Sequence, residues 1–152
     1  MSGYVAAHTN KLDAKGRVSI PAPFRTVLAR DGYDGLYCFP SPHSAAIDAG
    51  GNILLSQITS RLSGLDPLSE EYNMMSIAYF GSSETLKVDS GGRIMLSPNL
   101  RDVTGITDTA VFVGLNDKFQ IWEPGRYSAY SEASRQFAFG KLGTRAGQAV
   151  AE

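Results

Sequence analysis

The sequence is poor in the residues that most metal and redox sites require. Its 152 residues include one cysteine, Cys38, and two histidines, His8 and His43. A single cysteine excludes an internal disulfide and a cysteine-based zinc site. The histidines are 35 positions apart, with no thiol or carboxylate at ligand spacing. We therefore expect no metal and no cofactor, and we expect Cys38, inside an apolar run, to be an inert core residue.

The sequence also lacks the segments and motifs that mark several common protein classes. No apolar run approaches the ~20 residues of a membrane span, and residues 1–6 lack the basic and apolar regions of a signal peptide. There is no Walker loop, no Gly-x-Gly-x-x-Gly and no Gly-x-Ser-x-Gly. These absences argue against a membrane protein, a nucleotide-binding fold and an α/β-hydrolase. A cytoplasmic protein that is not an enzyme is the simplest expectation.

Charge of both signs nearly balances, and the net charge is −1. A chain so close to neutral is not expected to coat nucleic acid indiscriminately. The distribution is uneven, however, because residues 8–30 carry five basic residues against Asp13, whereas residues 31–83 carry Arg61 against six acidic residues. A local basic island is what binding to a phosphate backbone requires. The alternative, a solvated charged face, loses ground because the island coincides with a repeated motif.

The repeat is the strongest signal in the chain. Residues 12–20 and residues 88–96 share the pattern apolar-Asp-x-x-Gly-Arg-apolar-x-apolar, at an offset of 76 positions. The match continues to Phe24-Arg25 and Leu100-Arg101 at the same offset. A repeat of this length predicts a duplicated structural unit.

Each copy of the motif has the chemistry of a tight turn between two strands. Asp13 and Asp89 can accept hydrogen bonds from backbone amides ahead of them in a type I turn. Gly16 and Gly92 tolerate the left-handed conformation at the turn exit. The arginine after each glycine then lies near the base of a hairpin, where it either pairs with the aspartate or reaches outward.

These two motifs in order, each followed by a proline and a Phe-Arg or Leu-Arg pair, resemble the MraZ family of bacterial transcriptional regulators over residues 4–139. The halves of that family belong to the AbrB-like, swapped-hairpin class of DNA-binding domains. The resemblance implies an α+β fold in which two pseudo-symmetric swapped-hairpin units form a small barrel with flanking helices. The expected units are 5–52 and 83–126 for the two hairpin domains, 53–82 for a helical connection, 127–140 for a C-terminal helix and 141–152 for a disordered tail.

Local patterns add detail to these units. Asp66 and Pro67 predict the cap and first residue of the second connecting helix, and Ser97-Pro98 predict the same for a helix in the second unit. Gly140 predicts the end of the C-terminal helix. Residues 44–48, the counterpart of the alternating strand at 118–122, are less apolar and predict a weaker strand.

The resemblance implies sequence-specific binding of double-stranded DNA and regulation of transcription, typically of the division and cell-wall gene cluster including the protein's own promoter. It also implies a ring-shaped homo-oligomer associated with the nucleoid. Because one protomer offers few cations, we expect binding to clustered short direct repeats through several subunits. The candidate contacts carried over from the family are Lys15, Arg17, Arg25, Arg93 and Arg101, with Lys11 added from charge alone. The turn-shaping candidates are Asp13, Gly16, Asp89 and Gly92.

Three alternatives remain open at this point. Arg25 and Arg101 could form internal ion pairs in place of DNA contacts. Asp89-Ser90-Gly91 resembles an aspartic-protease motif with Asp13 as partner, but each aspartate has an arginine four positions on that would keep it ionised. Swapped-hairpin domains also occur in antitoxin-like or assembly proteins, which usually carry one hairpin unit and a disordered partner-binding tail.

Overall fold

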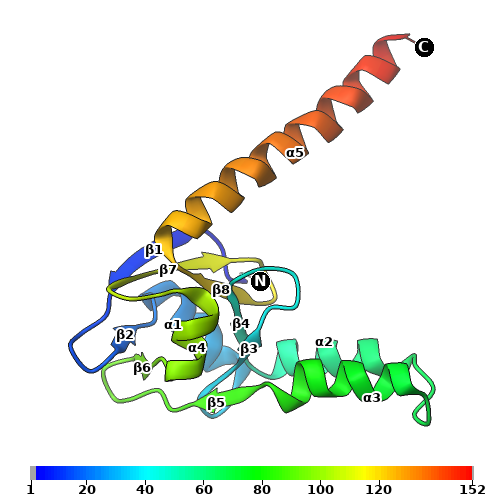
Figure 1. Ribbon diagram of the computed structural model, residues 1–152. Coiled ribbons are helices and arrows are strands. Elements are labelled where there is room, and N and C mark those ends of the chain that lie inside the picture. The colour runs from blue at the N-terminus through cyan, green and yellow to red at the C-terminus, as the bar shows by residue number, and fades with distance from the viewer. Residues whose placement is uncertain (1–2, 152) are drawn as a thin grey trace.

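The computed structural model describes residues 3–151, with side chains described as far as residue 143. Strands and helices follow one another along the chain (Figure 1). The elements of the first half are β1 (Ala7–Lys11), β2 (Arg17–Ser19), α1 (Ala22–Asp31), β3 (Leu36–Pro40), β4 (Ile47–Gly50), α2 (Asn52–Ser63), α3 (Glu70–Ser76) and the π-helical turn η1 (Ile77–Gly81). Those of the second half are β5 (Glu84–Leu86), β6 (Arg93–Met95), α4 (Pro98–Thr104), β7 (Thr109–Gly114), β8 (Phe119–Trp122) and α5 (Pro124–Ala151).

The strands form two antiparallel sheets, which confirms the α+β class. One sheet has six strands in the order β1-β7-β8-β4-β3-β5, and the other is a ribbon of β2 and β6. The small closed barrel expected from the sequence is not found among the described strands. The reason is that β2 and β6 pair with each other and do not connect β1 to β5, so the larger sheet stays open.

The two halves of the repeat are interleaved. Strand β1 pairs with β7, β4 pairs with β8, and β2 pairs with β6, so each of these ladders joins one half to the other. The strands on either side of the first turn therefore leave in different directions, β1 into the large sheet and β2 into the ribbon. The same hydrophobic core is consequently built from both copies of the motif.

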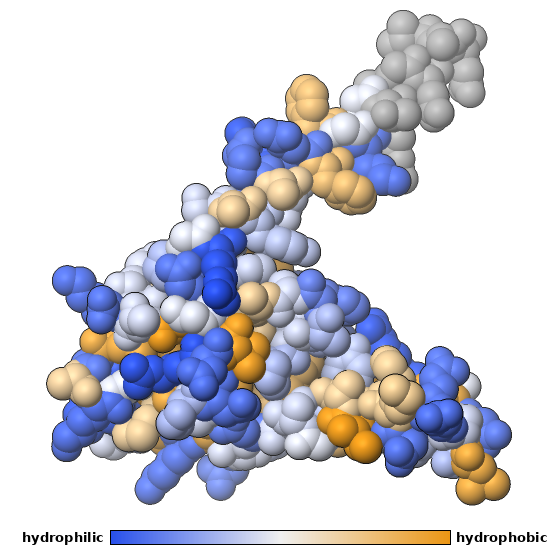
Figure 2. All heavy atoms as spheres, viewed as in Figure 1, coloured by the Kyte–Doolittle hydropathy of each residue, from blue (hydrophilic) through white to orange (hydrophobic). Residues whose placement is uncertain are grey.

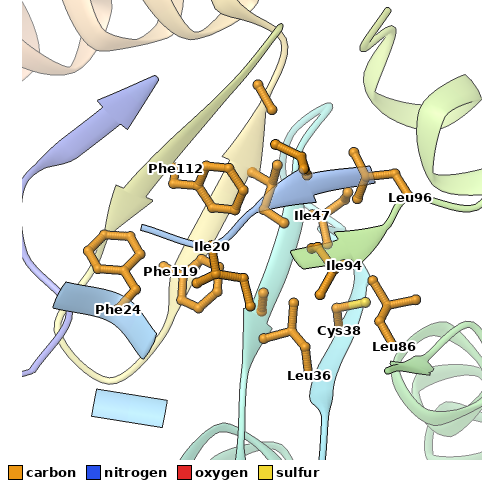
Figure 3. Packing of buried hydrophobic residues seen from close by; sticks show 14 of the residues in the cluster. Ile20, Phe24, Leu36, Cys38, Ile47, Leu86, Ile94, Leu96, Phe112 and Phe119 are labelled. Carbon is orange, nitrogen blue, oxygen red and sulfur yellow. The ribbon is translucent and has the colours of Figure 1, made fainter. Parts of the chain in front are cut away.

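That core lies between the ribbon and the large sheet (Figure 3). Phe24 and Leu100, at equivalent positions of the repeat, are both fully buried, as are Ile20, Phe112 and Phe119. Burying side chains of this size contributes roughly 1.5–3 kcal/mol each. The apolar positions of the motif are thus required by the core, whereas its charged positions are left for the surface.

The two helix caps predicted from the sequence have different outcomes. Ser97 caps α4 by accepting a hydrogen bond from the Leu100 amide at 3.2 Å, as predicted. The start predicted for the second connecting helix is wrong, because Asp66 caps only a local turn by accepting from the Leu68 amide. Ser69 accepts instead from the Tyr72 amide at 3.1 Å, and α3 begins one residue later.

The strand predicted to be weak over residues 44–48 is well formed, but as β4 it begins at Ile47 and ends at Gly50, later than predicted. Strand β4 lies between β3 and β8, and all four of its residues are buried. Its polar residue, Asp48, is 2% exposed and accepts hydrogen bonds from Lys118 at 2.9 Å and Gln120 at 2.7 Å. The charged residue of this segment is therefore one partner of a buried ion pair. The alternation of apolar and polar residues in a sequence does not distinguish a buried charged residue from an exposed one.

Helix α5 starts at Pro124, three residues before the start expected at residue 127, and leaves the body as a single long helix (Figure 1). The end predicted at Gly140 is wrong, since the helix continues to Ala151. A glycine costs only about 1 kcal/mol in a helix interior and does not by itself end one. The disordered tail predicted for 141–152 is contradicted over 141–151, which are helical. The side chains beyond residue 143, and Glu152 altogether, lie outside the described residues. None of the described helices combines the length and apolar character that crossing a bilayer demands.

Candidate nucleic-acid interface

The ribbon of β2 and β6 separates its side chains onto two faces. Val18 and Ile94 are directly opposite each other and only 1% exposed, so they point into the core. Successive residues of a strand point to opposite faces. The outer face of the ribbon therefore carries two cross-strand pairs, Arg17 opposite Met95 and Ser19 opposite Arg93.

The turn before β2 is held by one aspartate. Asp13 Oδ1 accepts hydrogen bonds from the backbone amides of Lys15 and Arg17, both at 2.9 Å. The Gly16 amide donates to the Asp13 carbonyl at 3.0 Å, and Gly16 has a φ of 83°. The aspartate-held turn with glycine at the left-handed position is as the sequence predicted. The local hairpin predicted around it is not formed, because β1 pairs with β7 and β2 pairs with β6, so the strands that flank the turn do not pair with each other.

The turn before β6 repeats the arrangement closely. Asp89 Oδ1 accepts from the amides of Gly91 and Arg93 at 2.9 Å, and Gly92 has a φ of 77°. The backbone N–H of Arg17 lowers the pKa of Asp13, and the backbone N–H of Arg93 lowers the pKa of Asp89. Both oxygens of each carboxylate thus accept hydrogen bonds from donors of their own turn, and neither aspartate is recorded in contact with the other among the described residues.

The motif arginines are both anchored and exposed. Arg17 Nε donates to Asp13 Oδ2 at 2.7 Å, and Arg93 Nε donates to Asp89 Oδ2 at 3.0 Å. The two arginine side chains remain 32% and 41% exposed. Among the described residues the terminal Nη atoms of both arginines have no recorded partner. A guanidinium held through Nε can still present Nη donors in a fixed direction.

The second pair of arginines crosses between the halves. Arg25, on α1, lies against Gly92 of the second turn, where a Cβ would collide with its side chain. Arg101, on α4, lies against Gly16 of the first turn, where a Cβ would be 3.1 Å from Arg101 Nη1. Neither arginine forms an ion pair with a residue in the described part of the chain. The internal ion pairs considered as an alternative are therefore absent from this region.

Each end of the ribbon thus combines residues of both halves. We call the end near the first turn the first end, and it holds Lys15, Arg17, Met95 and Arg101. The second end holds Ser19, Arg25, Gly91 and Arg93. Their backbone symmetry is maintained by matching hydrogen bonds, because Leu96 N donates to Gly16 O at 3.2 Å and Ile20 N donates to Gly92 O at 2.9 Å.

One candidate cation was missed by reasoning from sequence. Lys11 is exposed at the end of β1, and the repeat offset places Lys87 at the equivalent position before the second turn, also exposed. Applying the same offset to every basic residue would have found it. The described residues contain no group of three or more His, Cys, Asp or Glu side chains placed to hold a metal ion.

Comparisons with known proteins identify close relatives along most of the chain. Residues 79–148 match the family model described as "MraZ protein, putative antitoxin-like". A protein of Methylocella silvestris named "Transcriptional regulator MraZ" is 58% identical over 89% of this chain and 82% of its own length. Proteins with the same name from Beijerinckia indica and Xanthobacter autotrophicus are 54% and 51% identical over 89% and 90% of this chain, and over 82% and 87% of their own lengths. Relatives of this similarity, together with the repeated turns and their anchored arginines, show that the chain belongs to the MraZ family.

Proposed function

We propose that this protein regulates transcription by binding double-stranded DNA in a sequence-specific manner through the β2–β6 ribbon. The observation that carries the proposal is the outer face of the ribbon, where two exposed arginines are fixed by aspartates and flanked by two further arginines. The major groove of B-DNA, about 12 Å wide, admits a two-stranded ribbon. The names of the relatives support the regulatory role.

The positions of the cations suggest that some contact bases and others contact phosphates. Arg17 and Arg93 present Nη donors from the outer face of the ribbon, which suits bidentate contact with guanine O6 and N7. Arg25 and Arg101 lie beside the turns, and exposed Lys11 and Lys15 lie before and within the first turn, which suits contact with phosphates. Asp13, Gly16, Asp89 and Gly92 shape the turns and orient the arginines.

Assembly into a ring-shaped homo-oligomer forms part of the proposal. Apolar surface gathers on α5 and on the α2–α3 hairpin (Figure 2). On α5, Phe137 is 69% exposed and Phe139 79% exposed; Met74 on α3 and Ile77 at the start of η1 are exposed to a similar degree. Exposed apolar surface of this kind is typical of protein–protein contact sites. Several protomers would then present several ribbons to clustered short direct repeats.

The proposed setting is the cytoplasm, in association with the nucleoid, at the promoter of the division and cell-wall gene cluster that includes the protein's own gene. The test is a titration of that promoter DNA, with probes that carry one, two and several repeats and a shuffled probe as control. At about 150 mM salt we expect tight binding to several repeats, weak binding to one and weaker binding to the shuffled probe. Equal affinity for all probes would overturn sequence-specific, multivalent binding.

An antitoxin-like role is the second candidate, because the description of the matching family model names it. Such a protein would form a stoichiometric complex with a partner protein. The same titration separates the two, since the purified protein alone should bind its promoter if it is a regulator in its own right. Failure to bind DNA alone, together with a partner that co-purifies at a fixed ratio, would favour the antitoxin-like role.

A further inference from the structure

The two ends of the ribbon are symmetric in their backbone but not in their side chains. Ser19 and Met95 occupy equivalent positions of the repeat, 76 residues apart. Both lie on the outer face, where Met95 is opposite Arg17 and Ser19 is opposite Arg93. The first end therefore pairs an arginine with a thioether, and the second end pairs an arginine with a hydroxyl.

Met95 is exposed in a way that core packing does not explain. Its side chain is 52% exposed, although its neighbours Ile94 and Leu96 are 1% and 2% exposed and belong to the core. A thioether is only a weak acceptor and donates no hydrogen bond. Placed beside a guanine-reading arginine, it offers an apolar, flexible contact surface. In the major groove the one apolar group on a base edge is the C5-methyl of thymine.

We infer that Met95 is a specificity-determining residue that contacts the methyl group of a thymine, an inference that rests on the DNA-binding function proposed above. Side chains directly opposite on one face of an antiparallel pair are about 4.5–5.5 Å apart at Cβ. Successive bases of a strand are about 3.4 Å apart. Met95 is therefore close enough to Arg17 to contact a base pair near the guanine that Arg17 reads.

Ser19 gives the second end a different preference. A hydroxyl can donate to or accept from any base edge and gains nothing from a methyl group. The DNA element read by one ribbon is accordingly asymmetric, with guanines related by the pseudo-twofold axis and a methyl-dependent thymine at one end only.

The test uses deoxyuridine, which differs from thymidine only by the missing methyl group. An operator is first selected from random DNA with the wild-type oligomer, and each thymine is then replaced singly by deoxyuridine. We expect deoxyuridine at one position in each element to weaken binding by about 4-fold, which corresponds to the loss of one buried methyl group. Met95→Ser should bind the thymine and uracil probes equally, and Ser19→Met should create a second sensitive position at the other end.

The outcomes separate this inference from the function on which it rests. If wild-type binding depends on Arg17 but tolerates deoxyuridine at every position, the role assigned to Met95 is wrong and the DNA-binding ribbon stands. If Met95→Ser keeps the wild-type sensitivity, another residue makes the methyl contact and the inference fails. If Arg17→Ala and wild type bind the selected operator equally, the ribbon is not the reading element and both proposals fail. Melting temperature and oligomer size, measured for each variant, show that the fold is retained.

Discussion

Replacing Arg17 by alanine should abolish specific DNA binding while leaving the fold nearly unchanged. The turn survives because Asp13 is held by the backbone amides of Lys15 and Arg17, and these donors do not depend on the Arg17 side chain. The substitution removes the exposed contact from Arg17 Nε to Asp13 Oδ2. Exposed ion pairs contribute little to the free energy of unfolding, so the melting temperature should fall by no more than about 4 °C.

The loss in binding is much larger than the loss in stability. One arginine–guanine contact contributes about 1–3 kcal/mol of discrimination, which corresponds to about 5–150-fold in affinity for each ribbon. Because each protomer of the proposed oligomer carries the same change, the losses multiply over the ribbons engaged on one DNA. Specific binding should then become indistinguishable from binding to shuffled DNA.

The assay is fluorescence anisotropy with the selected operator and a shuffled probe, alongside thermal unfolding of both proteins. Arg61→Ala is the matched control, since it removes the same charge from an exposed residue of α2, outside the ribbon. Because α2 belongs to the proposed assembly surface, the oligomer size of this variant is measured as well. Binding by Arg61→Ala should remain within a factor of two or so of wild type, as screening of distant charges requires. An Arg17→Ala protein that binds the operator normally but melts far earlier would show that Arg17 is a structural residue.

Three further predictions concern the turns. Gly91→Lys supplies the second turn with the cation that the first turn has in Lys15, at a position where a Cβ meets only ordinary contacts. The slope of log affinity against log salt concentration should then steepen by about 0.9 for each added phosphate contact. Gly91→Ala is the control and should leave the slope unchanged. Asp13→Asn should keep much of the turn, because the amide oxygen can accept the same hydrogen bonds from the backbone, whereas Asp13→Ala should disorder the turn. If both variants lose DNA binding equally while their backbone amides exchange at wild-type rates, the effect is due to the lost charge and not to the turn. The pKa of both Asp13 and Asp89 is lowered from 3.8 in the folded protein, so the stability they contribute is complete above about pH 5 and decreases as the pH falls through 3.8 towards the lowered values. A double Asn variant should therefore lose less stability between pH 5 and pH 3 than wild type. Parallel curves of unfolding free energy against pH for the two proteins would contradict this.

Much of the site could be predicted from the sequence because turn chemistry is local. The aspartate, the left-handed glycine and the arginine lie within five consecutive residues, and their hydrogen bonds join positions at most four apart. The buried apolar positions 18 and 94 followed from alternation with their neighbours for the same reason. The repeat then transferred each inference from one half to the other.

The features that the sequence did not reveal depend on long-range pairing. That Arg25 lies against Gly92, and Arg101 against Gly16, follows from the pairing of β2 with β6, which no local pattern records. The same pairing makes each end of the ribbon a mixture of both halves, so the two halves do not form separate DNA-binding surfaces. The local sequence predicts a weak strand at β4 because it does not show that the buried Asp48 pairs with Lys118, 70 positions away. Asp66 and Gly140 show that a capping residue or a glycine alone does not fix where a helix begins or ends.

The central claim, that the β2–β6 ribbon reads guanines in the major groove, is tested most directly by methylation interference on the selected operator. Methylation of guanine N7 blocks one of the two acceptors that a bidentate arginine uses. We predict strong interference at guanines of each element with the wild-type protein, and loss of this guanine pattern with Arg17→Ala and with Arg93→Ala, whose remaining binding is non-specific. Binding that is insensitive to N7 methylation in all three proteins, or an interference pattern that neither substitution changes, would contradict the account.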